Sequence, residues 1–413
     1  MTIKPDISSP NLPTTIANAD ITVVGGAGHV GIPLVLALAE AGLRVNVNDL
    51  NQQTLDLLQS GKLPFIERDA DPVLTKVLAN GRLVFTNGPD KISTSGPVII
   101  TIGTPIDEFL NPVRKVVQDC IDSLLPTLAD GQLLILRSTV FPGTVAWLDG
   151  YLKAQGRDLR LAFCPERVVQ GNGLHELREM PQIVSGTTPE AAADAAALFA
   201  RIAPEVVTVS PAEAEFAKLF ANAYRYIEFA ATNEFYLIAK SAGVDYQRVL
   251  SVMKHNYPRL KSMPRPGFAA GPCLVKDTMQ LSAFASNRFG LGHSALLINE
   301  GLVLHIVEDL KRRFDLPNTT VGLLGMAFKA DSDDVRASLS YKVKKVLVGH
   351  ARTVLTTDPF VTTDPDLKPL DEVIAKSDIM ILCAPHTAYK TADLKGKPVF
   401  DVWGDLSGAN VIR

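Results

Sequence analysis

Residues 21–49 carry the pattern that most constrains the fold of this chain. A short apolar strand begins at Ile21 and runs into a turn with three glycines in G-x-G-x-x-G spacing, Gly26, Gly28 and Gly31. An Ala- and Leu-rich helix follows, and a second short strand then ends at Asp49. This βαβ context is what the dinucleotide-binding fingerprint requires, so the pattern predicts a nucleotide site. The alternative is a tight strand-to-helix turn with no ligand.

Each fingerprint residue has a physical reason. Gly26 allows the tight turn, Gly28 lets a pyrophosphate approach the helix N-terminus, and Gly31 lets helix and strand pack closely. Asp49 is placed to accept hydrogen bonds from ribose hydroxyls. No Arg occurs at residues 50–52, so a 2′-phosphate would meet a carboxylate without a compensating cation. The pattern therefore favours NAD over NADP as the cofactor.

Three further apolar segments, at 96–105, 133–144 and 161–167, predict that the parallel strand–helix order continues. In an open α/β sheet, ligands lie beyond the carboxyl ends of the strands. The polar residues where these segments end are therefore expected to face one crevice; they are Thr104, Ser138, Thr139, Glu166 and Arg167. Any one of them alone could be a turn hydroxyl or a surface charge.

The organisation of the chain changes twice. Residues 212–255 and 291–314 lack strand patterns and predict helices, and an α/β pattern restarts at Thr319 without the third fingerprint glycine. The expected fold class is α/β, with two Rossmann-like doubly wound parallel sheets joined by a central all-α domain. The expected boundaries are a flexible tail at 1–18, a nucleotide-binding domain at 19–208, a helical domain at 209–315 and a second α/β domain at 316–413.

The helical region supplies candidate catalytic groups. Lys218 and Asn222 are four residues apart and so share a helix face, where they could hold a developing oxyanion. A Lys in such a place can equally extend to water. Lys329 and Arg336 follow a glycine turn in the second α/β unit, where phosphate contact is expected and a surface charge is the alternative.

Cys273 lies in a loop rich in Gly, Ala and Pro, and the residues from Thr278 predict the start of a helix, so that Cys273 would be near a helix N-terminus. There the backbone N–H groups, the helix dipole and the ammonium of Lys276 would all favour a thiolate. This is the setting of a nucleophilic cysteine, and the alternative is a buried structural one.

Bulk properties exclude several classes of protein. The formal net charge of −3 gives no indication of a nucleic-acid or membrane partner, and no apolar run reaches the roughly 18 residues of a membrane span. The four cysteines form no CxxC pair, so the sequence predicts neither a metal site nor a disulfide framework. Such cysteine usage favours a cytoplasmic protein.

With these motifs in order, the chain resembles the UDP-glucose/GDP-mannose dehydrogenase family over nearly its whole length. The motifs that carry the resemblance are the fingerprint, Gly103-Thr-Pro, Arg137-Ser-Thr139, Cys164-Pro-Glu166-Arg167, Lys218-x-x-x-Asn222, the Cys273 loop with Lys276-Asp277, and Ala327-Phe-Lys329 through Arg336. The resemblance implies an N-terminal NAD domain, a central dimerisation domain that carries the cysteine loop, and a C-terminal UDP-sugar domain.

The resemblance also implies roles for individual residues. Cys273 would form a thiohemiacetal and then a thioester, because an aldehyde must first be converted into a species that can donate a second hydride. Asp277, Glu166 and Thr139 would handle the hydrolytic water, and Lys218 and Asn222 the oxyanions. Lys276 and Arg336 are expected to contact the cofactor. Substrate contacts are expected from Arg167, Lys218, Tyr257, Arg259, Gly267, Phe268 and Lys329, with Arg259 shared across a homodimer.

Within the family, Cys164-Pro-Glu-Arg and Tyr257-Pro-Arg259 look like the branch that oxidises UDP-N-acetylhexosamines, above all UDP-N-acetylmannosamine. Ala270-Gly271 replaces the usual Gly-Gly, and Lys276-Asp277 looks more like the glucose branch. UDP-glucose, UDP-N-acetylglucosamine and UDP-N-acetylgalactosamine are therefore alternative substrates. The alternatives from other classes are a two-electron hydroxyacid-type dehydrogenase and a non-catalytic nucleotide-sugar sensor.

Overall fold

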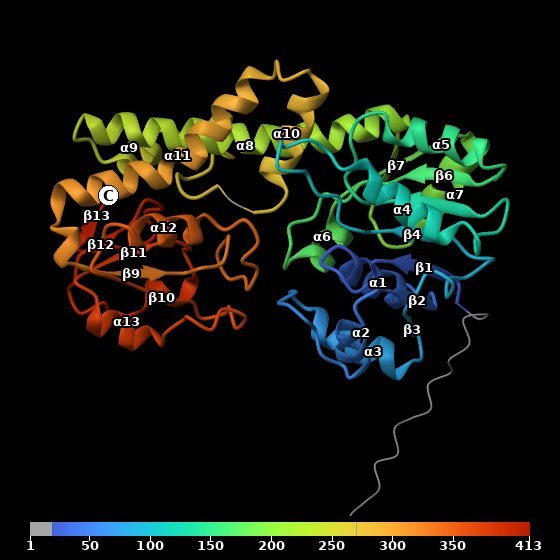
Figure 1. Ribbon diagram of the computed structural model, residues 1–413, viewed down its shortest axis with the longest axis horizontal. Coiled ribbons are helices and arrows are strands. Elements are labelled where there is room, and N and C mark those ends of the chain that lie inside the picture. Colours follow the sequence, from blue (N-terminus) through green and yellow to red (C-terminus); the bar gives the residue numbers. More distant parts are fainter. Residues whose placement is uncertain (1–18, 270) are drawn as a thin grey trace, which may run out of the picture. The chain divides into compact units, whose positions relative to one another are not determined.

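The computed structural model describes residues 19–269 and 271–413; the expected tail at 1–18 lies outside these described residues, as does Ala270. The chain divides into two compact units. The first comprises residues up to 105 and 112–218, and the second comprises 106–111 and 219–413. Figure 1 follows the chain from blue to red through both units.

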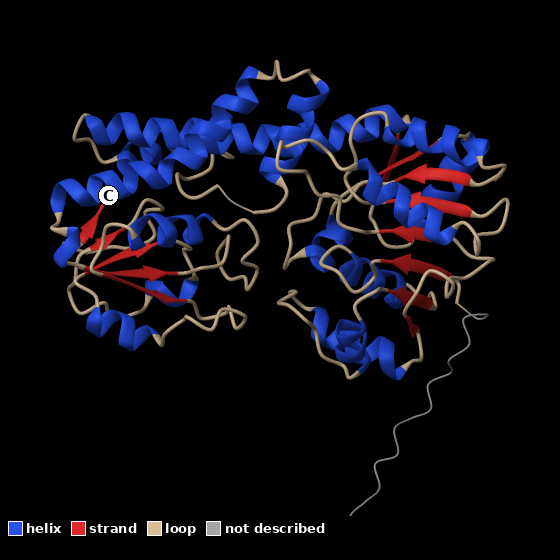
Figure 2. Ribbon diagram, in the orientation of Figure 1, coloured by secondary structure: helices blue, strands red, loops and turns tan. Residues whose placement is uncertain are grey.

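In the described part of the chain, the first unit contains an eight-stranded sheet in the order β3-β2-β1-β4-β5-β6-β7-β8 (Figure 2, red). Its strands are β1 Ile21–Val24, β2 Val45–Asn48, β3 Leu83–Thr86, β4 Val98–Ile100, β5 Leu133–Leu136, β6 Arg160–Phe163, β7 Gln182–Gly186 and β8 Val206–Thr208. Its helices are α1 Gly31–Glu40, α2 Gln52–Gln59, α3 Ala70–Ala79, α4 Arg114–Leu124, α5 Thr144–Ala154, α6 Gly173–Glu179 and α7 Pro189–Phe199.

Helices cover both faces of this sheet, and its strands β1, β4 and β5 are short and fully buried. One core cluster joins the sheet to α1, α2, α3, α6 and α7, and another joins it to α4 and α5. The first six strands follow the 3-2-1-4-5-6 order of a dinucleotide-binding sheet, as predicted. One pairing differs from the expected parallel pattern: β7 runs antiparallel to β6.

The helical region has nearly the expected bounds. It consists of α8 Pro211–Ser241, α9 Tyr246–Lys254, a short 3₁₀ turn at Pro258–Leu260, α10 Leu274–Phe284 and α11 Gly290–Arg313. By length and composition alone, α11 could cross a membrane. However, one of its faces, which includes Leu302, Val303 and Ile306, is buried in a core cluster with the second sheet. This burial is typical of a core helix in a globular domain.

The second sheet has five parallel strands within the described residues, in the order β10-β9-β11-β12-β13. Its elements are a 3₁₀ turn Leu316–Asn318, β9 Thr320–Leu324, α12 Leu339–Val348, β10 Thr353–Thr357, α13 Leu370–Lys376, β11 Ile379–Leu382, α14 Thr387–Lys390, β12 Val399–Phe400 and β13 Val411–Ile412. Core clusters on its two faces involve α8, α9, α11 and α12 on one side and α13 and α14 on the other. This is also a doubly wound arrangement, as the sequence predicted.

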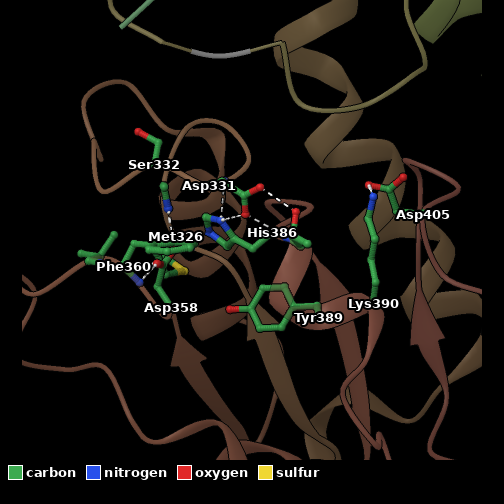
Figure 3. Close-up of polar contacts among 12 residues, drawn as sticks. Met326, Asp331, Ser332, Asp358, Phe360, His386, Tyr389, Lys390 and Asp405 are labelled. Carbon is green, nitrogen blue, oxygen red and sulfur yellow. Dashed lines mark hydrogen bonds and ion pairs between the residues drawn. The ribbon is translucent and has the colours of Figure 1, made fainter. Parts of the chain in front are cut away.

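Asp358 ends β10 as Asp49 ends β2, but its carboxylate is fully buried and enclosed by protein donors (Figure 3). Oδ2 accepts hydrogen bonds from the backbone N–H groups of Met326 at 2.6 Å and Ala327 at 3.0 Å, and lies 3.0 Å from Nε2 of His386. Because Nδ1 of His386 accepts from the Asp331 N–H at 2.8 Å, the ring proton must be on Nε2 and is donated to Asp358. This carboxylate is therefore not available to a ribose.

This arrangement makes the stability of the second unit depend on pH. Burial by itself would raise the pKa of Asp358, but the hydrogen bond from His386 and those from the backbone donors outweigh it and lower the pKa to about 2. Because the folded pKa lies below the unfolded value, the stabilisation is complete above about pH 4 and disappears as pH falls through about 2; it amounts to roughly 2 kcal/mol.

We expect Asp358→Asn to lower the free energy of unfolding at pH 7 by at least roughly 2 kcal/mol, because the amide N–H groups would face backbone donors. Urea unfolding followed by Trp403 fluorescence in a Trp147→Phe background would measure the loss. The exposed Asp393→Asn is the matched control and should change stability little. Equal stability of the Asp358→Asn protein and the control at pH 7 would contradict this account.

Candidate active site

The fingerprint turn between β1 and α1 is too tight for side chains at two of its three glycines. A Cβ at Gly31 would lie 2.3 Å from the Gly25 carbonyl oxygen, and one at Gly26 would lie 2.8 Å from that of Val23. At Gly28 the nearest atom would be 3.4 Å away, an ordinary contact. The protein itself therefore requires glycine at 26 and 31, while glycine at 28 leaves the space outside the turn open for a phosphate.

Asp49 is oriented by the same turn. Its Oδ2 accepts from the Ala27 N–H at 3.1 Å, and its Oδ1 accepts from the Asn51 N–H at 3.0 Å. Asp49 is a partly exposed residue, and its carboxylate keeps acceptor capacity for ribose hydroxyls. The glycine turn and Asp49 together fit an NAD molecule, with its pyrophosphate at the N-terminus of α1.

Adjacent strands β4, β5 and β6 bring the predicted polar residues to the carboxyl edge of the first sheet. The Thr104 hydroxyl donates to the Thr139 carbonyl oxygen at 2.5 Å, and the Ser138 hydroxyl donates to that of Ile102 at 2.6 Å. Arg167 follows β6 and donates to the Pro181 carbonyl oxygen. The prediction that strand ends gather these side chains at one edge is consistent with these contacts.

Glu166 is held by Arg137 at the end of β5, a residue to which the motif alone assigned no role. Arg137 is fully buried, forms an ion pair with Glu166 Oε2, and donates from Nη1 to the Cys164 carbonyl oxygen at 3.1 Å. The other oxygen of Glu166 accepts from the N–H groups of Arg167 at 2.7 Å and Val168 at 3.0 Å. Both carboxylate oxygens are thus engaged by protein donors, which fix the orientation of the side chain.

Helix α10 begins directly after Cys273, at Leu274, which is earlier than the start expected at Thr278. The Cys273 carbonyl accepts the first helical hydrogen bond from the Asp277 N–H at 2.9 Å. Asp277 is fully buried, and its Oδ2 accepts from Nδ2 of Asn222 at 2.6 Å. Its Oδ1 lies 3.7 Å from Nζ of Lys276 and has no hydrogen-bond partner among the described residues. Asn222, Lys276, Asp277 and Cys273 therefore form one cluster in the second unit.

The other three cysteines are unsuited to nucleophilic chemistry. Burial raises the pKa of Cys120 to about 11 and that of Cys164 to about 12, and it raises the pKa of Cys383 further still. Cys273 is only partly buried and lies at the N-terminus of an eleven-residue helix. Because a thiolate is the nucleophile and a helix N-terminus stabilises it, Cys273 is the candidate.

Two loops of the second unit lie against each other. A Cβ on Gly271 would be 2.9 Å from the Phe328 ring, and the Gly271 N–H donates to the Ala337 carbonyl oxygen at 3.4 Å. The loop that carries Lys329 and Arg336 therefore borders the cysteine loop. Arg336, however, forms a bidentate pair with Asp334, at 2.9 and 2.7 Å, so a phosphate contact would compete with this pair.

The remaining candidates differ in exposure. Lys218 is buried on α8, four residues before Asn222, and Phe268 is buried in the loop before Cys273. Tyr257 and Arg259 are exposed and interact with each other, with Nη1 of Arg259 donating to the Tyr257 hydroxyl at 3.2 Å. An exposed Arg is available to a partner subunit, as its expected role requires.

The glycine-rich phosphate turn with its ribose acceptor is typical of the nucleotide site of a dehydrogenase, and the cysteine at a helix N-terminus in the second unit is a candidate nucleophile. Family models for the UDP-glucose/GDP-mannose dehydrogenase family match all three regions: the NAD binding domain at 19–203, the central domain at 212–300 and the UDP binding domain at 322–407. The chain belongs to this family and is an NAD-dependent nucleotide-sugar 6-dehydrogenase.

Relatives with known functions span almost the whole chain. A UDP-N-acetyl-D-mannosamine dehydrogenase of Pyrococcus horikoshii is 28% identical over 89% of this chain and 90% of that protein. An NDP-N-acetyl-D-galactosaminuronic acid dehydrogenase of Ralstonia nicotianae is also 28% identical, over 95% of this chain and 97% of that protein. A solved structure of the Pyrococcus horikoshii UDP-D-ManNAc dehydrogenase has a TM-score of 0.86 at 27% identity and covers 94% of this chain and 96% of that chain.

These findings confirm the resemblance, the fold class and NAD as the cofactor. They also decide against the two alternatives from other classes. A hydroxyacid-type dehydrogenase needs no second α/β unit with a UDP binding domain, and a sensor is excluded because the chain is a family enzyme.

The orientation of Asp49 yields a test of cofactor choice. We expect Asp49→Asn to weaken NADH binding roughly tenfold, because a charged acceptor for ribose is lost. NADPH binding should improve relative to NADH binding, because the 2′-phosphate no longer meets a carboxylate. Fluorescence titration with both cofactors measures this, and Asp56→Asn on the exposed side of α2 is the control. Equal affinity of the unmodified protein for NADH and NADPH would contradict the role of Asp49.

Proposed function

We propose that the enzyme oxidises the C6 hydroxymethyl group of UDP-N-acetylmannosamine to the carboxylate, through a thioester on Cys273. The observation that carries the chemistry is the position of Cys273 at the start of α10, beside the buried Asn222–Asp277 pair. The choice of sugar is supported by the name of the Pyrococcus horikoshii relative and by the Cys164-Pro-Glu-Arg and Tyr257-Pro-Arg259 motifs. UDP-glucose and the other UDP-N-acetylhexosamines are the alternatives.

NAD, when bound at the fingerprint, accepts one hydride in each of two oxidations, so that R–CH₂OH + 2 NAD⁺ + H₂O gives R–COO⁻ + 2 NADH + 3 H⁺. The thiolate of Cys273 adds to the aldehyde carbon between the two oxidations and leaves when water cleaves the thioester. Lys218 and Asn222, one turn apart on α8, would hold the oxyanion that forms at each addition. Holding the aldehyde covalently prevents its release before the second oxidation.

Hydrolysis of the thioester requires a group that orients water. Asp277 is the best candidate, because its buried Oδ1 has no hydrogen-bond partner among the described residues. Both oxygens of Glu166 are instead engaged by Arg137 and backbone N–H groups. We therefore assign Glu166 a positioning role at the strand edge, with the Thr139 hydroxyl as an additional contact for water or substrate.

Substrate and cofactor contacts follow the family pattern. Arg167, Lys218, Gly267, Phe268 and Lys329 would contact the UDP-sugar, while Thr104, Ser138, Lys276 and Arg336 would contact the cofactor. The cytosol keeps thiols reduced, so a required free thiol on Cys273 supports a cytoplasmic location.

The first test is the stoichiometry of the reaction. With a panel of UDP-sugars, we expect UDP-N-acetylmannosamine to give the fastest NADH release and two NADH per sugar consumed. Cys273→Ser should bind the sugar but produce no acid, since a serine at an unshifted pKa is a poor nucleophile. Cys120→Ser, which changes a cysteine outside the proposed site, is the matched control. A yield of one NADH per sugar, or acid formation by Cys273→Ser, would overturn the proposal.

We also propose a homodimer with Tyr257 and Arg259 near the partner's substrate. In the second unit, α8 and α11 expose large apolar residues, between 45% and 74% accessible: Phe220, Tyr224, Phe235, Ile238, Leu291, Leu297 and Leu304. On α8, Tyr224 and Phe235 are eleven residues apart, close to three full turns, so they fall on one face. An apolar stripe of this kind is typical of a subunit interface.

Ile238→Asp should therefore yield monomers, because it places a charge in the apolar stripe. Analytical ultracentrifugation measures the assembly, and Val348→Asp, equally exposed on α12, is the control that should remain dimeric. Because Arg259 is proposed to act across the interface, NADH release should fall with dimer content. A fully active monomer would refute the shared site.

A further inference from the structure

The loop that leads to Cys273 is bound by two adjacent, fully buried residues of α8. The Thr232 hydroxyl donates to the Pro264 carbonyl oxygen at 3.1 Å. Asn233 binds both backbone groups of Gly267: its Oδ1 accepts from the Gly267 N–H at 2.8 Å, and its Nδ2 donates to the Gly267 carbonyl oxygen at 3.0 Å. The Asn233 amide thus forms the same two hydrogen bonds with the Gly267 backbone that a residue of a neighbouring β-strand would form.

A second buried amide fixes the orientation of the first. Asn299 on α11 accepts from Nδ2 of Asn233 at 2.9 Å, and its own Nδ2 donates to the Tyr226 carbonyl oxygen at 3.0 Å. Both N–H groups of Asn233 and its oxygen are therefore engaged, and a flipped amide would lose all three contacts. A buried polar network that is fully satisfied specifies one arrangement of the chain.

Aromatic rings fix the other side of the same loop. Gly267 has φ near +153°, and a Cβ there would lie 2.3 Å from the Trp403 ring. Phe268 is buried and packs edge-on against Trp403, with ring centroids 6.3 Å apart. Gly267 is thus held between the Asn233 amide and Trp403, and only glycine fits this position.

We infer that Asn233 is a positioning residue, which holds Gly267 and Phe268 in the conformation that receives the UDP-sugar and delivers the chain to Cys273. This inference rests on the proposed function of the site. A loop fixed before binding avoids the entropy cost of ordering it on the ligand, and small displacements of a reacting group are costly. Loss of the hydrogen bonds between Asn233 and Gly267 should therefore weaken sugar binding much more than the loss of an equally buried amide elsewhere.

The test uses the whole enzyme and measures how UDP-N-acetylmannosamine protects Cys273 from iodoacetamide, with the modified cysteine identified by mass spectrometry. In Asn233→Ala, and in Asn233→Asp, which keeps the shape but loses the donor, the half-protecting concentration should rise roughly tenfold. KM for the sugar should rise in parallel. Asn299→Ala should have a smaller effect, and adding it to Asn233→Ala should change little further, because the two amides act as one unit.

The matched control is Asn46→Ala, which removes a fully buried amide bonded to Thr22, Thr86 and Lys91 in the first sheet. Asn46→Ala should lower thermal stability about as much as Asn233→Ala does. The half-protecting concentration of UDP-N-acetylmannosamine should nevertheless stay within roughly twofold of the wild-type value. If wild type is protected and the Asn233 and Asn299 variants are protected equally well, the inference is overturned while the proposed function stands. If the sugar protects not even the wild type and no NADH is released, the proposed function fails and this inference with it.

Discussion

The hydrogen bond from Asn222 to Asp277, 2.6 Å long and buried, connects the helix that begins at Cys273 to the long helix α8. Burying a carboxylate is costly unless its oxygens are paired. Here one oxygen is paired, and the other has only the Lys276 ammonium at 3.7 Å among the described residues. An unpaired oxygen on a buried carboxylate distinguishes Asp277 from Asp358, whose two oxygens are both enclosed by donors, and marks Asp277 as a candidate functional group.

Helix α8 carries much of the remaining machinery. Near its start, Glu215 accepts from the N–H groups of Gly143 at 2.7 Å and Val145 at 2.8 Å, so it caps the N-terminus of α5. Lys218 and Asn222 follow on the same helix, and Thr232 and Asn233, which bind the cysteine loop, lie further along it. The exposed apolar stripe from Phe220 to Ile238 lies on the same helix. In the proposed homodimer, the part of α8 in the second unit would carry both the subunit interface and the residues that hold the cysteine loop.

Local patterns were sufficient to predict much of the fold. The strand-glycine-helix-strand order at 21–49, the bounds of α8 and α9 and the helix after Cys273 all depend on residues close in sequence. The contacts that could not be predicted join distant residues: Arg137 with Glu166, Asn233 with Gly267 and Asp358 with His386. No periodicity encodes such pairs, because burial and tertiary packing decide which polar groups meet. A local competitor was also missed: Asp334, two residues from Arg336, engages the guanidinium that was expected to face a phosphate.

The central claim is that the sulfur of Cys273 carries the substrate between its two oxidations. The most direct measurement is intact-protein and peptide mass spectrometry of the reaction quenched with acid within one turnover. The account predicts an added mass equal to the acylated UDP-sugar, located on the peptide that contains Cys273. An unmodified protein, with free sugar aldehyde accumulating in solution during turnover, would contradict it.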